Sequence, residues 1–173
     1  MMMQALSAGG MPVLSDHERT ADEDNPRGYL ELELAKKIEQ DKSWLPQAQG
    51  KAVKLVSPLL RHLPQAYDYK IIFMQRDLTE VLASQQEMLR RRGAKVGGDD
   101  ISLARAFEKH LAGVAAWIAT QGNMDVVYVN YSDVVSDPFT QLARVRDFVG
   151  QDLALDAMMS AVDERLHRQR SGR

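Results

Sequence analysis

The sequence predicts an α/β fold with three layers, in which a central parallel sheet is flanked by helices. Three short apolar runs rich in β-favouring residues, at residues 52–57, 69–75 and 126–130, have the length of buried strands. Helical patterns separate these runs, and connections of that length join parallel strands. The chain has 173 residues and 45% hydrophobic composition, so we expect one domain over residues 1–173.

The first half of the chain is expected to contain two helices and a loop before the first strand. Residues 1–6 have the pattern of a helix already in progress, without an N-cap, and Gly9 and Gly10 provide its stop. Residues 15–28 are polar and contain Asn-Pro and Gly, so we expect a loop there. Residues 29–40 carry apolar side chains at helical spacing, which predicts a surface helix.

Capping residues mark the helices of the second half. A run of three arginines before Gly93 ends one helix, and a loop follows at residues 94–98. Asp99 or Asp100 caps the next helix, and Asp137 followed by proline begins another. The expected helices cover residues 78–92, about 100–121, 138–149 and 155–169.

Composition excludes several classes of function. A formal net charge of −2 provides no general attraction for nucleic acid. The absence of cysteine excludes disulfides and thiolate metal sites and suits a reducing compartment. No apolar run approaches the roughly 18 residues of a membrane span, and the four histidines lack metal-ligand spacing. We therefore expect a cytoplasmic protein without a metal, a nucleic-acid partner or a membrane span.

The most informative residues lie at the end of the strand predicted at residues 69–75. This strand delivers Arg76 to the carboxyl edge of the sheet, and the following helix carries Ser84 about two turns along. Both side chains can converge on one anion if the helix lies close to the strand end. Equally, Arg76 can pair with Asp77 or Glu80, with the serine a small helix residue.

Arg76 and Ser84 resemble the strand and helix that bind the 3′-phosphate in sulfotransferases that use 3′-phosphoadenosine-5′-phosphosulfate (PAPS). In that family the arginine at the strand end and the serine eight positions later clasp the phosphate. Residues 126–150 are similar to the family block of a strand, Tyr-x-Asp, Asp-Pro and a helix ending Phe-x-Gly. There the tyrosine, which corresponds to Tyr131, lies near the adenine, although it can equally be a packing residue.

The resemblance extends over nearly the whole chain and implies a P-loop NTPase-like fold of the sulfotransferase type. Residues 25–29 and 166–170 look like the bacterial branch of the family. It implies transfer of a sulfuryl group from PAPS to a hydroxyl or amine on a small-molecule or carbohydrate acceptor, with 3′,5′-ADP as the product and no metal. Arg168 then contacts the nucleotide phosphate or acceptor, unless it belongs to a frayed cationic helix end.

The resemblance also suggests catalytic residues. Lys54 aligns with the lysine of a Lys-Thr-His-Leu-Pro-Leu strand end, where it would neutralise charge on the sulfuryl group, or it simply reaches solvent. Val56 stands where the family has its catalytic histidine. Glu31 and Asp24 are the nearest carboxylates that could replace that base, and a solvated surface position is the simpler interpretation of each.

One family feature is missing from the sequence. A Gly-rich loop of the Pro-x-Ser-Gly-Thr-Ser kind holds the 5′-phosphosulfate in these enzymes, and the chain begins inside the helix that follows it. We therefore expect an N-terminally incomplete domain with weak donor binding, and either a homodimer through the strand edge that this leaves or poor solubility. The alternative is a non-catalytic nucleotide-binding or scaffold protein of the same fold. A kinase is disfavoured because the Walker lysine is absent.

Overall fold

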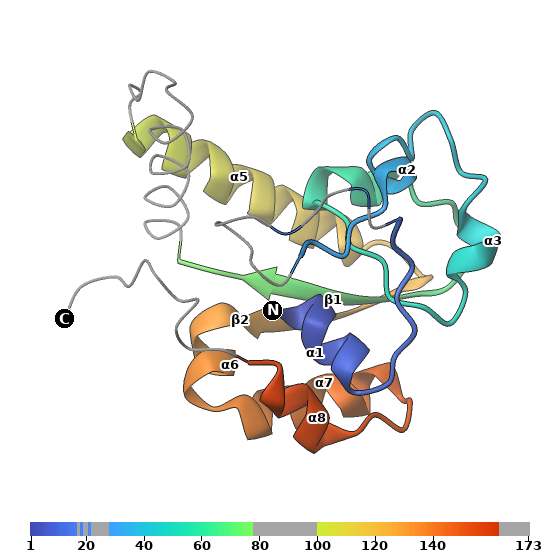
Figure 1. Cartoon of the computed structure of the whole chain (residues 1–173). Coiled ribbons are helices and arrows are strands. Elements are labelled where there is room, and N and C mark those ends of the chain that lie inside the picture. Colours follow the sequence, from blue (N-terminus) through green and yellow to red (C-terminus); the bar gives the residue numbers. More distant parts are fainter. Residues whose placement is uncertain (17, 19–20, 22–27, 78–99, 163–173) are drawn as a thin grey trace.

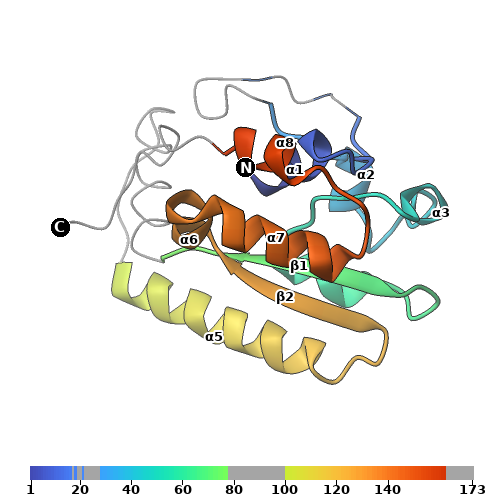
Figure 2. The ribbon, with the colours of Figure 1, turned by 90° about the horizontal axis from the view of Figure 1, so that it is seen from below.

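The computed structural model of the chain describes residues 1–16, 18, 21, 28–77 and 100–162. Within these residues a two-stranded parallel sheet is flanked by helices on both faces (Figures 1 and 2). Helix α5 lies on one side of the strands, and helices α1, α7 and α8 lie on the other (Figure 2). The predicted α/β fold with a parallel sheet between helical layers is confirmed.

The sheet consists of β1 (Tyr69–Gln75) and β2 (Met124–Asn130), which pair in parallel from Tyr69 opposite Met124 to Gln75 opposite Asn130. The first strand has the predicted bounds, and the second begins two residues earlier than expected. Side chains of a strand alternate between its two faces. One face therefore contributes residues 72, 74, 127 and 129 to the larger apolar cluster, and the other contributes residues 69, 71, 73 and 126 to the cluster beneath α5.

The larger cluster lies between the sheet and the helices α1 (Met2–Ala8), α7 (Pro138–Val149) and α8 (Leu155–Ser160). Helix α1 packs against α8, and the backbone N–H of Ala154 donates to the carbonyl of Gly9 at 2.9 Å. A Cβ atom at Gly9 would lie 2.5 Å from Cγ of Met158, so the close approach requires glycine. The buried members of the larger cluster are Met2, Ala5, Leu6, Ala52, Val127, Val129, Val134, Leu142, Val145, Val149, Leu153 and Met158.

Caps define both ends of α7. The side chain of Asp137 accepts a backbone N–H of the first turn, and Gly150 follows the helix with a left-handed φ of 72°. Lys70 reaches from β1 to the other end, where its Nζ donates to the carbonyls of Phe148 (2.8 Å) and Val149 (3.1 Å). Asp137 and Gly150 adjoin the helix in the sequence, and these two local signals explain why the helix has the predicted bounds.

The opposite face of the sheet is covered by α5 (Asp100–Ile118) and by a 3₁₀ helix, η1 (Ser57–His62). Two contacts join these helices besides apolar packing. Oγ of Ser57 lies 2.9 Å from Nε2 of His110, and the guanidinium of Arg61 lies 5.8 Å from the ring centroid of Trp117. The helix predicted over about 100–121 is therefore confirmed and ends three residues early.

The strand predicted at residues 52–57 is wrong. Only Ala52 makes a β-bridge, an isolated parallel one with Val13, and the chain then enters η1 at Ser57. Pro58 lies in the first turn of η1, where a residue without an N–H is well suited to start a helix. The apolar run therefore does not form a buried strand: Ala52 is buried at the bridge, Val53 and Leu55 are half-buried, and Val56 is 60% exposed.

The helix predicted at residues 29–40 is mostly wrong. Only α2 (Glu33–Lys36) is helical, because Leu30 has a left-handed φ of 47° and Leu32 is extended. Of the apolar residues at helical spacing, Leu30 is half-buried, Leu34 is 40% exposed and Ile38 is buried, together with Ala35, in a second cluster. Its other buried members are Leu32, Trp44 and Leu45.

Two short helices were not expected from the sequence, α3 (Leu45–Ala48) and α6 (Tyr131–Ser136). Helix α8 ends at Ser160, within the helix predicted over 155–169, and residues 163–169 of that prediction lie outside the described residues. The predicted helix at 78–92 and the loop at 94–98 lie outside the described residues. None of the helices in the described ranges combines the length and apolar character that crossing a membrane requires.

Candidate functional site

Arg76 and Tyr131 meet at the carboxyl edge of the sheet. Each directly follows a strand, and Gln75 pairs with Asn130, so the parallel register places the two residues side by side. The guanidinium carbon of Arg76 lies 4.8 Å from the centroid of the Tyr131 ring, and both side chains are half-buried. This distance is typical of a cation–π contact.

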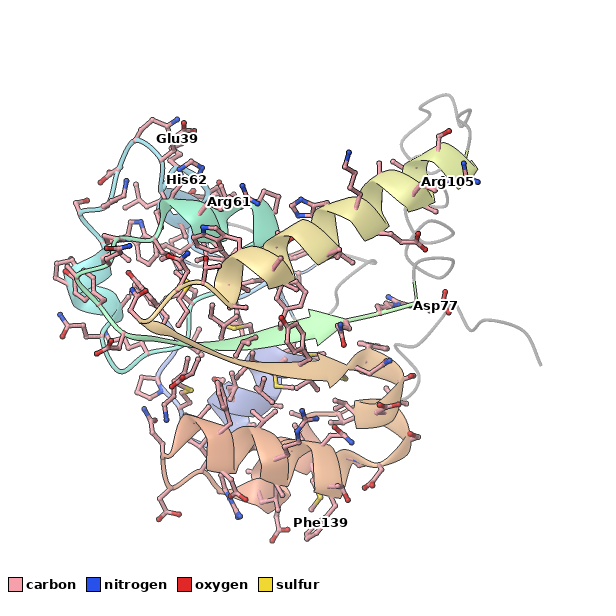
Figure 3. The ribbon with its side chains drawn as sticks, turned by 180° about the vertical axis from the view of Figure 1, so that it is seen from behind. Glu39, Arg61, His62, Asp77, Arg105 and Phe139 are labelled. Atoms are coloured by element: carbon pink, nitrogen blue, oxygen red, sulfur yellow. The ribbon has the colours of Figure 1, made fainter. Side chains whose placement is uncertain are left out.

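The chain turns sharply beyond Asn130. The side-chain oxygen of Asn130 accepts hydrogen bonds from the backbone N–H (3.0 Å) and the hydroxyl (2.9 Å) of Ser132, which starts α6. On the neighbouring strand, Asp77 lies directly beyond the end of β1 (Figure 3). The edge therefore carries a cation, an aromatic ring and exposed polar groups, as expected of a ligand-binding edge of a parallel sheet.

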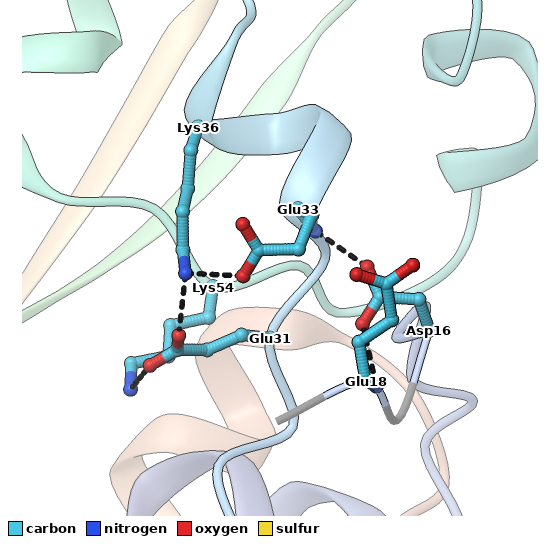
Figure 4. A network of polar contacts seen from close by, with 6 residues as sticks. All are labelled: Asp16, Glu18, Glu31, Glu33, Lys36 and Lys54. Carbon is cyan, nitrogen blue, oxygen red and sulfur yellow. Dashed lines mark hydrogen bonds and ion pairs between the residues drawn. The ribbon is translucent and has the colours of Figure 1, made fainter.

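A second group of polar residues surrounds Glu31 (Figure 4). Nζ of Lys54 lies 2.8 Å from Oε1 of Glu31, and Nζ of Lys36 lies 3.0 Å from Oε2. The Glu31 side chain is 12% exposed. Lys54 also lies 5.8 Å from the ring centroid of Tyr29. One carboxylate thus holds two lysines, one of them the predicted catalytic lysine.

The pKa of Glu31 follows from these contacts. Burial alone would raise this pKa, but the hydrogen bonds and charges of Lys54 and Lys36 outweigh burial and lower the pKa to about 2. Glu31 therefore stays ionised at neutral pH and accepts a proton poorly. A general base works best when its pKa is near the operating pH, so this carboxylate is better suited to position Lys54 than to deprotonate an acceptor.

Asp16 ties the same group to the preceding segment. Its Oδ2 accepts the backbone N–H of Glu33 at 2.5 Å, and its Oδ1 accepts that of Glu18 at 3.1 Å. These hydrogen bonds, from Glu33 first, lower the pKa of Asp16. Glu33 in turn pairs with Lys36. The start of α2 is therefore fixed by a side chain rather than by its own propensity.

The structure brings the predicted site residues together in two pairs. Arg76 contacts Tyr131, and Lys54 contacts Glu31. Three others, Asp24, Ser84 and Arg168, lie outside the described residues.

Sequence reasoning missed two features of the site. The role of Lys36 was not predicted, although its i,i+3 spacing from Glu33 on a helix is a usable signal. The cation–π contact between Arg76 and Tyr131 depends on strand register, which the sequence does not supply.

Val56, at the position of the family histidine, is 60% exposed. No group of three or more His, Asp or Glu side chains within the described ranges is placed to hold a metal ion.

The fold is that of α/β proteins with a parallel sheet, a class in which ligands commonly bind beside the carboxyl ends of the strands. A family model described as "sulfotransferase family" matches residues 14–154, which is most of the chain. The chain therefore belongs to the sulfotransferase family. Among curated proteins and among solved structures, no match to the chain was found.

Proposed function

We propose that this protein transfers a sulfuryl group from PAPS to a hydroxyl or amine on a small-molecule or carbohydrate acceptor and releases 3′,5′-ADP. The observation that carries the proposal is the half-buried guanidinium of Arg76 at the end of β1 in a chain of the sulfotransferase family. An arginine at this edge suits a phosphate, which it can bind through two parallel hydrogen bonds.

The nucleotide side of the proposed site consists of Arg76, Ser84, Tyr131 and Arg168. Arg76 and Ser84 bind the 3′-phosphate, and Arg168 adds a contact to nucleotide phosphate or acceptor. On the acceptor side, Lys54 offsets the negative charge that develops on the sulfuryl oxygens. Its ion pair with Glu31 supports this role, because a lysine held in place needs less reorganisation during the reaction. Positioning and cations are sufficient for this chemistry, so we propose no metal.

The proposed reaction needs a general base that deprotonates the acceptor. Two carboxylates, Glu31 and Asp24, were the sequence candidates. The lowered pKa of Glu31 favours a positioning role for that residue. Asp24 is therefore the carboxylate that we retain as the candidate base.

Nucleotide binding tests the proposal directly. Calorimetric titration should give a higher affinity for 3′,5′-ADP than for 5′-AMP, which differs only by the missing 3′-phosphate. Arg76→Met should lower the 3′,5′-ADP affinity by about 10- to 100-fold, because it removes a charge-assisted hydrogen bond. Arg144→Met, which removes an exposed arginine of α7, is the matched control and should have little effect. Equal affinity of the unmodified chain for both nucleotides would reject the proposal.

A second candidate function is a non-catalytic nucleotide-binding or scaffold protein of the same fold. It is favoured by the low pKa of Glu31 and by Val56 at the position of the family histidine. The two candidates separate in one measurement with ³⁵S-labelled PAPS and a panel of phenols, alcohols, amines and sugars. Selective 3′,5′-ADP binding without label transfer to any acceptor supports the second candidate, and label transfer supports the enzyme.

We also propose a homodimer that forms along the edge of β1. Among the described residues β1 pairs only with β2, and none of its seven residues is fully buried. By contrast, Met124, Val127 and Val129 of β2 are buried. An apolar strand edge of this kind tends to pair with another strand. Light scattering that finds a stable monomer over a range of concentrations would reject the dimer.

We keep a cytoplasmic location within this proposal, because a sequence without cysteine suits a reducing compartment.

A further inference from the structure

Arg76 and Tyr131 are brought together by the strand register. Met74 pairs with Val129, and the side chains of both point into the larger apolar cluster. Gln75 pairs with Asn130 at the ends of the two strands, so Arg76 and Tyr131, the next residues of each chain segment, lie next to each other. The contact between guanidinium and ring therefore follows from the register of the sheet.

The ring of Tyr131 is attached to a fixed part of the molecule. Tyr131 is the first residue of α6, which the Asn130 side chain caps. Two residues of the same helix, Val134 and Val135, are buried, and α6 packs against α7. A ring on such a support limits the freedom of a long side chain that lies over it.

We propose that Tyr131 is a positioning residue that holds the guanidinium of Arg76 ready for the 3′-phosphate of the nucleotide. The inference rests on the proposed function and adds a role for the Tyr131 ring that does not involve the adenine base. A guanidinium over an aromatic ring makes contact through its flat face, while its N–H donors lie in its own plane. The contact with the ring therefore restrains the side chain and does not itself use an N–H donor of Arg76.

This role predicts a specific pattern of affinities. A ring that acts through Arg76 affects only ligands that carry the 3′-phosphate, whereas a ring that contacts the base affects every adenine nucleotide. The comparison of 3′,5′-ADP with 5′-AMP isolates the difference. Tyr131→Phe keeps the ring and should retain the selectivity. Tyr131→Leu should lower the 3′,5′-ADP affinity by about 3- to 10-fold, the range of a partly buried cation–π contact, and leave 5′-AMP unchanged.

A double-mutant cycle completes the test. If the ring works through the arginine, Arg76→Met combined with Tyr131→Leu should bind 3′,5′-ADP no more weakly than Arg76→Met alone. Tyr128→Leu is the matched control, because it removes a tyrosine of β2 whose ring contacts Phe73 with a centroid distance of 5.5 Å. It should keep the selectivity while reporting any general loss of stability in thermal unfolding.

The outcomes that contradict the inference differ from those that reject the function. Equal losses for both nucleotides in Tyr131→Leu, additive effects in the cycle, or a Tyr131→Phe variant as weak as Tyr131→Leu would overturn the positioning role. Absence of any preference for 3′,5′-ADP in the unmodified chain would reject the proposed function and the inference with it.

Discussion

Residues 124–160 and residues 28–63 are stabilised in different ways. The first region consists of a strand and helices that bury a continuous apolar cluster against the sheet, with caps at the ends of α7. The second has short helices, a residue with positive φ and a cluster of its own, and three ion pairs fix its outer side. It also contains Trp44, whose buried Nε1 has no hydrogen-bond partner among the described residues. Regular packing therefore supports the proposed nucleotide side, whereas charge pairing supports the proposed acceptor side.

The largest effect is expected from the apolar cluster of the first region. Leu142 of α7 is fully buried, so Leu142→Ala should lower the free energy of unfolding by about 3 kcal/mol through lost burial and the cavity left behind. Urea unfolding monitored by circular dichroism measures this change. Leu34→Ala, in the second region, removes a leucine that is 40% exposed and is the control, with a loss of less than about 1 kcal/mol. Similar losses in the two variants would contradict the distinction between the regions.

A smaller effect is expected from the charge pairing of the second region. Glu31→Gln should lower the free energy of unfolding at pH 7 by about 1 to 2 kcal/mol. The figure is modest because the Lys54 and Lys36 side chains are 42% and 47% exposed and regain water. Glu33→Gln, which leaves both contacts of Glu31 in place, should cost less. If Glu31→Gln costs no more than Glu33→Gln, the ion pairs do not stabilise this region.

The same variant has a defined pH dependence. The pKa of Glu31 in the folded chain is about 2, below its ordinary value of 4.5. A lowered folded-state pKa contributes stability that is present above pH 4.5 and is lost as the pH falls toward 2. The stability difference between the unmodified chain and Glu31→Gln should therefore be constant near neutral pH and shrink across that acid window. Urea titrations at pH 7, 4 and 3 measure it, and a difference that does not change with pH would contradict the assigned pKa.

The smallest effect is expected where a charge from β1 caps a helix of the first region. Lys70→Met removes the hydrogen bonds to the last carbonyls of α7 and should cost about 1 kcal/mol. Lys51→Met, which removes an exposed lysine, is the matched control and should change stability by less. A loss equal to that of Leu142→Ala would mean that the cap, and not apolar packing, dominates this region.

The sequence was sufficient where the signals are local. Strand β1 and helix α7 have the predicted bounds, because an apolar run and the pair Asp137 and Gly150 mark their limits. Residues 29–40 and 52–57 were predicted wrongly because their conformation depends on distant partners. The left-handed Leu30 and the single bridge from Ala52 to Val13 leave no periodic trace in the sequence. Burial was predicted only in part in these segments, since Ile38 and Ala52 are buried whereas Leu34 and Val56 are exposed.

The candidate site shows the same limit. Arg76, Tyr131, Lys54 and Glu31 were each named from the sequence, but their two contacts span 55 and 23 positions and follow from register and folding. The lowered pKa of Glu31 could not be predicted, because Lys36 joins Lys54 only in the folded chain. Residue types and spacing therefore indicated candidates, and the fold indicated how they act on each other.

The close contact of α1 with α8 has a consequence for biosynthesis. Residues 2–8 are made well before residues 155–160, the helix that covers them. Until then the apolar side of α1 has no native cover, and contacts of such large sequence separation form slowly. Newly made chains should therefore depend on chaperones or rapid completion of synthesis more than a protein of this size with mainly local contacts.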